Sequence, residues 1–517
     1  MSLDLATVKS RVAIFSRDWG PIVLMALLHL VIHLIAVGRY GWFRDELYYF
    51  NSTRHIEWGY VDHPPLSIWI LALVRIFLGE SLAAVRILPI LAGAGVIVFA
   101  AVLTREMGGR RAASWLAAAA AFAVTGNHFN FHVYSMNWLD ILIWQISILI
   151  LVRLFKRPDS RLFLLFGLTA GIGLLNKISV LFLWFGLVAG LVLTKERRRI
   201  LDLRFWSAGG LSLALFLPYI IWNAVSGWPH LEFIHNARTF KMASVSALDF
   251  FFSQAMYNNP VNLFLWLSGL AWLLFHPGGR RFRTLGWLFL SIYVLFTIQG
   301  AKDYYLAGGY PVLFAAGAIL WDSVNRRKVR QALVAAGTGL ILTGGLISLP
   351  LAVPVLPVET TARMAAFTGI VEKTSGERHQ KGILPQHFAD MLGWPEMVDK
   401  VAEAASRLTP EERRRAIVFT MNYGQAGAVN LLRRQQGLPP AYSGHNNHFF
   451  WPPPADVEVA ILIGSRKILE EYFESGELVA RTESRFNMPY ENDLPIRIYR
   501  GMKKPFGDIW PCLKHFN

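Results

Sequence analysis

The chain has 517 residues, of which 54% are hydrophobic and only 17% are charged, with a formal net charge of +16. A soluble protein would carry about a quarter charged residues, so this composition indicates a polytopic membrane protein. Nucleic-acid binding is not favoured as the reason for the basic charge, because the basic residues lie in short clusters between apolar runs. The single cysteine, Cys512, excludes an internal disulfide.

About 11 apolar segments predict helices that cross a membrane, although several are short for that purpose. They are 21–38, 85–104, 112–126, 138–152, 161–176, 178–194, 205–222, 260–275, 284–299, 306–321 and 331–350. A further apolar run at 66–79 is interrupted by Arg75, which predicts a helix that lies at the membrane interface. Basic residues precede the first span without a clear cleavage site, so we expect an uncleaved anchor.

Basic residues are concentrated in alternate loops, which predicts the orientation of the chain. One set of loops carries the basic clusters that begin at Arg105, Arg153, Lys195, Arg280 and Arg326, and the intervening loops carry few. The basic loops and the N-terminus are therefore expected in the cytoplasm. An odd number of spans then places the C-terminal part on the outer side. We expect a transmembrane domain over 1–353, with a first outer loop at 39–84.

The composition changes after residue 353, and residues 354–517 suit one soluble α/β domain. Its predicted strands are 415–420, 457–464 and 496–500. Gly424 and Gly427 follow the first strand and precede a helical stretch. This pattern suits a phosphate cradle at a helix N-terminus or an ordinary strand-to-helix turn. The turn is favoured, because two glycines alone are weak evidence for phosphate.

Polar residues gather directly after the first span, where carboxylates are costly beside hydrocarbon and are therefore functional candidates. Arg44, Asp45 and Glu46 follow an apolar run, and His63 comes about twenty residues later, before two prolines. Asp45 is a candidate general base that the charge of Arg44 would keep ionised. The alternative is an acid that stabilises the first turn of a helix. Glu46 is a candidate for substrate binding, but it would face elsewhere on a helix, so a structural role is favoured.

The sequence Arg44-Asp45-Glu46-Leu47-Tyr48-Tyr49, followed by His63-Pro64-Pro65-Leu66, resembles the first outer loop of C-type glycosyltransferases. More narrowly, it is similar to the bacterial protein O-mannosyltransferase-like family, which is related to the lipid A aminoarabinose transferases. The resemblance continues through VRILP at 85–89, SMNWLD at 135–140, LLNK at 174–177 and GAKDYY at 300–305, and it covers roughly residues 15–350.

This resemblance implies a membrane enzyme that uses a polyprenyl-phosphate sugar and inverts the anomeric carbon. Asp45 would be the catalytic base, and Asp140 would orient the acceptor or share a proton with Asp45. The alternative for Asp140 and the neighbouring Asn137 is a helix start. Metal dependence varies among relatives, and the chain has no DxD motif of the kind that holds a nucleotide-sugar metal. No cofactor is therefore assigned, and a divalent metal stays open.

Several basic and aromatic residues at the outer ends of spans are candidates for contact with the donor phosphate or sugar. They are Arg86, Lys177 and Lys302, the last of which precedes Tyr304 and Tyr305. The alternative for each cation is snorkelling toward lipid head groups. His63 would line the pocket, bind substrate or cap a helix. The histidines His128, His132, His230 and His235 are also expected on the outer side, but their spacing is not diagnostic of a metal site.

The sequence therefore predicts an inverting glycosyltransferase of the bacterial inner (plasma) membrane. It would transfer a hexosyl or pentosyl group from a polyprenyl-phosphate donor to a glycolipid, polysaccharide or protein acceptor. Its other expected partner is the lipid bilayer, and no nucleic-acid partner is expected. The C-terminal domain would be periplasmic. The alternatives are a lipid-linked-sugar transporter or flippase and a non-catalytic polyprenyl-phosphate-binding scaffold. A transporter would show repeated halves and broken helices near the midplane, whereas the polar motifs here gather at one face.

Overall fold

The computed structural model describes residues 5–243, 245–373, 377–378, 380–465 and 471–517. The chain divides into two compact units, which are described separately. The helical unit comprises residues 1–37, 86–217 and 244–355. The mixed unit comprises residues 38–85, 218–243 and 356–517, and it combines helices with a five-stranded sheet.

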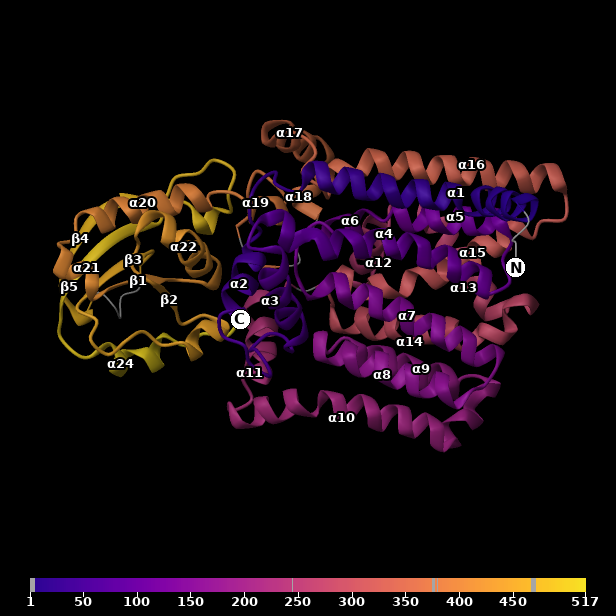
Figure 1. Ribbon diagram of the computed structural model, residues 1–517, viewed down its shortest axis with the longest axis horizontal. Helices are drawn as coiled ribbons and strands as arrows, with labels where there is room; N and C mark the ends of the chain where they lie inside the picture. The colour runs from indigo at the N-terminus through magenta and orange to yellow at the C-terminus, as the bar shows by residue number, and fades with distance from the viewer. Residues whose placement is uncertain (1–4, 244, 374–376, 379, 466–470) are drawn as a thin grey trace. The chain divides into compact units, whose positions relative to one another are not determined.

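Long helices with roughly parallel axes form the helical unit (Figure 1). Their bounds are α1 Leu5–Ala36, α4 Leu82–Glu106, α5 Arg111–Phe122, α6 Thr125–Asn130, α7 Met136–Lys156, α8 Ser160–Asn176, α9 Val180–Val192, α10 Leu203–Val225, α12 Ala247–Tyr257, α13 Asn262–Phe275, α14 Arg283–Gln299, α15 Tyr310–Asp322 and α16 Arg327–Ser348. In the described residues, seven helical segments are long and apolar enough to cross a membrane, and α8, α9 and α13 are shorter apolar helices. Every segment predicted as a span is helical, so the prediction of a polytopic α-helical protein is confirmed.

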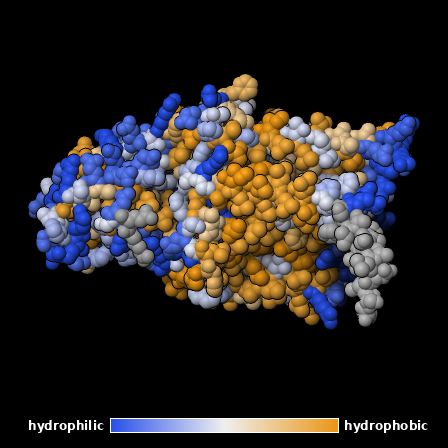
Figure 2. Space-filling model, turned by 45° about the horizontal axis from the view of Figure 1, so that its top comes forward, coloured by the Kyte–Doolittle hydropathy of each residue, from blue (hydrophilic) through white to orange (hydrophobic). Residues whose placement is uncertain are grey.

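The surface of the helical unit is apolar over a broad area, as Figure 2 shows in orange. Large apolar side chains are exposed along several of its helices, including Leu24, Leu27, Val31, Leu34 and Ile35 on α1 and Leu213 and Leu217 on α10. Soluble proteins rarely expose a continuous apolar surface of this kind. The helical unit therefore has the surface expected of a protein in contact with lipid, and the chain is a multi-pass membrane protein.

Two glycines allow α13 and α15 to pack in close contact. A Cβ atom on Gly269 would lie 2.0 Å from the carbonyl oxygen of Leu313, and one on Gly317 would lie 2.1 Å from the carbonyl oxygen of Leu265. Small residues at helix contacts are typical of membrane proteins, where close van der Waals packing replaces the hydrophobic effect as the source of association. This contact positions α15, which directly follows the segment with Lys302, Tyr304 and Tyr305.

The mixed unit is built around a sheet of strand order β2-β1-β3-β5-β4. The strands are β1 Ala416–Thr420, β2 Ala441–Ser443, β3 Val459–Ile463, β4 Phe473–Arg481 and β5 Pro495–Met502. β1 pairs in parallel with β2 and β3, and β5 pairs antiparallel with β3 and β4. The predicted strands correspond to β1, β3 and β5. A small mixed sheet in the C-terminal part confirms the predicted α/β domain.

Helices of the mixed unit come from segments far apart in the sequence. They include α2 Arg44–Ser52, α3 Leu66–Leu78, α11 Pro229–Asn236, α17 Val358–Thr368, α18 Ile370–Lys373, α19 Gln386–Ala389, α20 Trp394–Ser406, α21 Pro410–Arg414, α22 Tyr423–Gln436 and α24 Phe506–Ile509. The apolar run at 66–79 is thus helical, as predicted.

Helix α22 packs directly on α2, the helix of the first loop. A Cβ atom on Gly427 would lie 2.6 Å from the carbonyl oxygen of Leu47, and one on Gly424 would lie 2.7 Å from Cγ of Arg44. The two glycines therefore serve this close helix contact, which supports the strand-to-helix turn over the phosphate cradle.

The α13–α15 contact makes a direct prediction. We expect Gly269→Ala to lower the thermal unfolding temperature of the detergent-solubilised protein, because relieving the overlap with Leu313 costs about 1–3 kcal/mol. Gly210→Ala on α10 is the matched control, since its Cβ meets nothing within 4 Å. Equal unfolding temperatures for the two variants would contradict the close contact.

Candidate active site

The first turn of α2 carries the predicted motif, and its three charged residues have different surroundings. The carboxylate of Glu46 is buried and accepts a hydrogen bond of 2.9 Å from the backbone N–H of Phe43, which caps the helix. Glu46 thus has the contacts of a structural residue. Asp45 is half-buried, and its Oδ1 accepts a hydrogen bond of 3.0 Å from the hydroxyl of Tyr423 on α22.

Arg44 donates hydrogen bonds to two tyrosine hydroxyls, one of which also binds Asp45. Its guanidinium donates to the hydroxyl of Tyr490 at 2.9 Å and to that of Tyr423 at 3.2 Å, and it lies over the ring of Tyr423 at 4.9 Å. Tyr490 in turn donates to Oδ1 of Asp390 at 3.0 Å. The positive charge of Arg44 is therefore held between two aromatic rings, close to the carboxylates of Asp45 and Asp390.

A second half-buried carboxylate of the first loop was not among the predicted site residues. Oδ1 of Asp62 accepts a hydrogen bond of 2.7 Å from the hydroxyl of Tyr48, and the rings of Tyr48 and Tyr423 lie 4.6 Å apart. Two packed tyrosines thus orient one carboxylate each. The position of Asp62 beside His63, in the same motif, is the sequence signal that could have identified it.

His63 is fully buried within the mixed unit. Its ring stacks on Tyr49 at 4.6 Å and lies 5.1 Å from Tyr60, and its Nδ1 is 2.8 Å from the carbonyl oxygen of Pro64. These contacts hold the turn before the two prolines in place. They favour a packing role for His63 among the roles that the sequence left open.

In the helical unit, Asp140 and Lys177 form a buried ion pair. Their side chains are 6% and 8% exposed, and Nζ of Lys177 lies 3.4 Å from Oδ2 of Asp140. Ser179 donates to Oδ1 of Asp140 at 2.6 Å. Lys177 also donates to Oδ1 of Asn137 at 2.8 Å and lies about 5 Å from the ring centroids of Tyr304 and Tyr305. Four predicted site residues therefore surround one ammonium group.

These contacts leave the ammonium of Lys177, which has three donors, little freedom to reach another anion. One donor faces Asn137, one faces Asp140, and the remaining charge faces two aromatic rings. Lys302 is half-buried at the N-terminal end of the 3₁₀ segment Asp303–Gly309. Arg86 is fully buried and donates to the carbonyl oxygen of Val37 at 2.7 Å.

Burial changes the ionisation of two carboxyl groups near Arg44. It raises the pKa of Asp390 to about 6, although the charge of Arg44 acts in the opposite direction. It also raises the pKa of Glu491, whose oxygens accept hydrogen bonds from the side-chain amides of Gln425 at 2.7 Å and Asn422 at 2.8 Å. The buried carboxyl group of Glu491 thus fixes the N-terminus of α22 through hydrogen bonds. This end of the helix carries Tyr423, which contacts Asp45.

The fold is shared with solved membrane glycosyltransferases. ArnT from Cupriavidus metallidurans, in its apo state, matches with a TM-score of 0.61 at 14% identity, over 93% of this chain and 98% of that chain. The same protein bound to undecaprenyl phosphate matches with a TM-score of 0.60. The chain has the fold of a C-type glycosyltransferase. The predicted resemblance to this class is therefore confirmed.

Other comparisons agree with this C-type fold. The oligosaccharyltransferase AglB from Archaeoglobus fulgidus, in complex with an inhibitory peptide and a dolichol-phosphate, has a TM-score of 0.52 at 12% identity, over 95% of this chain and 77% of that chain. Residues 62–222 match the family model described as dolichyl-phosphate-mannose-protein mannosyltransferase. A comparison with curated protein sequences found no match.

The buried ion pair predicts strong coupling between two substitutions. Asp140→Asn or Lys177→Met alone leaves one buried charge without its partner, which costs about 3–5 kcal/mol. We expect the double variant to be more stable than either single variant, as measured by thermal unfolding in detergent. Additive losses would contradict the pairing of Asp140 with Lys177.

The raised pKa of Asp390 predicts a pH-dependent stability. The folded carboxyl group binds its proton more tightly than the unfolded chain does, so its stabilising contribution is complete below about pH 4 and is lost as the pH rises through about 6. Asp390→Asn removes this dependence. Relative to wild type, we expect the variant to gain up to about 3 kcal/mol between pH 4 and pH 7.5. Asp508→Asn, at an exposed position, is the control and should show no such gain.

Proposed function

We propose that this chain is an inverting glycosyltransferase that transfers a hexosyl or pentosyl group from polyprenyl phosphate to an acceptor at the outer face of the bacterial inner membrane. One observation carries the proposal: a fold match over nearly the whole of ArnT, a protein also solved with undecaprenyl phosphate. It is supported by the half-buried, hydrogen-bonded carboxylate of Asp45 in the first loop.

In this proposal Asp45 is the general base. The hydroxyl oxygen of the acceptor forms a bond to the anomeric carbon while its proton moves to Asp45, and the bond from that carbon to the phosphate oxygen breaks. Polyprenyl phosphate leaves on the opposite face of the sugar. A base must be ionised and oriented to act, and Tyr423 supplies the orientation by donating to Oδ1 of Asp45. Tyr423 is therefore proposed as a positioning residue.

The phosphate side of the reaction is assigned mainly to Lys302. A developing negative charge on the leaving phosphate requires a cation that can reach it. Among the predicted cations, Lys177 is 8% exposed and paired with Asp140, and Arg86 is fully buried. Lys302 is half-buried next to Tyr304 and Tyr305. We propose Lys302 as the phosphate contact, with the Asp140–Lys177 pair holding the tyrosines that precede α15.

The acceptor is proposed to be a glycolipid, polysaccharide or protein. Mass spectrometry of cell-envelope glycans and glycoproteins, with and without the gene, identifies the acceptor by the sugar that disappears. No change in any sugar decoration would count against the enzyme, provided that the protein is made in the control cells.

Asp45→Asn separates an enzyme from a transporter or a scaffold. We expect a fall in sugar transfer of about 100-fold or more, the usual contribution of a general base, while binding of polyprenyl phosphate changes little. Tyr423→Phe should give a smaller loss, because the carboxylate stays but its orienting donor is gone. Transfer is measured with membranes and a labelled donor lipid, and Asp508→Asn is the matched control. Full transfer by Asp45→Asn would overturn the assignment of the base.

A further inference from the structure

Four buried histidines lie close together in the helical unit. His29 and His33 lie four residues apart on α1, and therefore on one face of that helix. His128 belongs to α6, and His132 follows it after one turn. All four are buried, with 0–2% exposure. The sequence singled out His128 and His132 but not the pair on α1, whereas His230 and His235 belong to the mixed unit.

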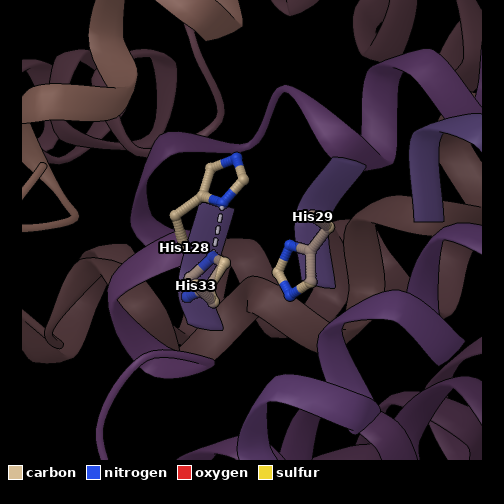
Figure 3. Close-up of side chains that lie close together, drawn as sticks. All are labelled: His29, His33 and His128. Carbon is tan, nitrogen blue, oxygen red and sulfur yellow. Dashed lines mark hydrogen bonds between the residues drawn. The ribbon is translucent and has the colours of Figure 1, made fainter. Parts of the chain in front are cut away.

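The rings of His29, His33 and His128 face a common space (Figure 3). One ring nitrogen from each lies within 4.8 Å of the other two. Nε2 of His33 and Nδ1 of His128 are 3.1 Å apart. Two imidazole nitrogens that bind one zinc-like ion at 2.0–2.1 Å in tetrahedral geometry are separated by about 3.3 Å. The His33–His128 pair already has nearly this separation, and His29 needs a shift of an ångström or two.

Hydrogen bonding among the neutral rings leaves donors and acceptors unmatched. Arg86 can only donate, so its contact of 3.4 Å makes Nε2 of His132 an acceptor and places that proton on Nδ1. His132 then donates to Nδ1 of His33 at 3.3 Å, and His33 donates through Nε2 to His128. This order leaves Nε2–H of His128 with no well-aligned acceptor in the described residues, although the backbone of Phe122 lies near the ring, and Nε2 of His29 has no hydrogen-bond partner there.

We propose that His29, His33 and His128 bind one first-row transition-metal ion of the kind that prefers imidazole, zinc or copper. The group offers nitrogen ligands only, and such ions accept them. His132 would serve as the outer partner of His33, because a metal-bound histidine donates its other N–H to a neighbouring acceptor. His132 would then carry its proton toward Arg86, so metal binding should lengthen the contact between Arg86 and His132.

Two features of the surroundings define the site further. A cavity of about 10 Å³ borders His29, His128 and Gly93, and this is about the smallest space that can hold one water. The ion would therefore be held without its hydration shell and with at most one water. A Cβ atom on Gly93 would lie 2.2 Å from Nε2 of His29, so only glycine leaves room for this ring.

The site would be structural, because it joins α1 to α6 and the turn that precedes α7. Helix α7 carries Asn137 and Asp140 at its start. Neutral ligands leave the charge of the ion uncompensated near Arg86, which favours monovalent copper over divalent zinc, since the cost of burial rises steeply with charge.

The test measures metal content in the full-length protein, expressed without a polyhistidine tag in cells grown with added zinc or, in parallel, added copper. We expect one ion of either metal per chain to remain after purification in the presence of a weak chelator. His29→Gln and His33→Gln should each reduce the metal content at least tenfold, whereas His235→Gln, at an exposed position on α11, should leave it unchanged.

X-ray absorption of the wild-type protein provides a measurement that does not depend on whether the variants fold. It should show nitrogen ligands of imidazole type at about 2.0–2.1 Å. Loading should also raise the unfolding temperature of wild type but not of His33→Gln. The proposal is overturned if neither metal is retained, or if the retained metal shows no imidazole ligands or survives both substitutions. These readouts do not involve sugar transfer, so they are independent of the proposed reaction.

Discussion

The hydrogen bond from the Tyr423 hydroxyl to Asp45 is the interaction on which the candidate active site depends. It joins residues 378 positions apart in the sequence, and Gly427 lets α22 approach the backbone of Leu47 closely. The same tyrosine ring lies beneath the guanidinium of Arg44. One helix contact therefore orients the carboxylate and places a positive charge close to it. A C-terminal domain that does this is part of the site, not only an appendage.

Much of the fold follows from patterns that extend over many residues. Every predicted span is helical, because long apolar runs beside lipid leave the backbone no other way to satisfy its hydrogen bonds. Strands β1 and β3 were recognisable as buried apolar runs. The sequence did not reveal β2, which has three residues, or β4, whose side chains are mostly exposed. Neither strand has the alternation that marks one buried face.

The candidate site was only partly predictable, because its decisive contacts are between distant segments. Asp45 was identifiable because it is a carboxylate next to an apolar run. The energetic cost of a carboxylate beside hydrocarbon can be recognised from the local sequence alone. Its partner Tyr423, like Tyr490 and Asp390 beside Arg44, belongs to a segment with no local signal of function. The role of Lys177 changed for the same reason: the sequence shows a cation at the end of a span, and only the fold shows Asp140 beside it.

The cost of burying polar groups also explains why the histidine cluster was recognised only in part. Histidines at 128 and 132 lie in a polar stretch between spans, where ligands are expected, whereas His29 and His33 lie within an apolar helix and resemble isolated core residues. A neutral imidazole can be buried without burying a charge, so such residues carry little signal one at a time. Their significance arises when a second segment places further rings against them, and one ring nitrogen of His29 and one of His128 are left without a well-aligned partner within the described residues. Counting hydrogen bonds across segments therefore points to a ligand site where sequence spacing does not.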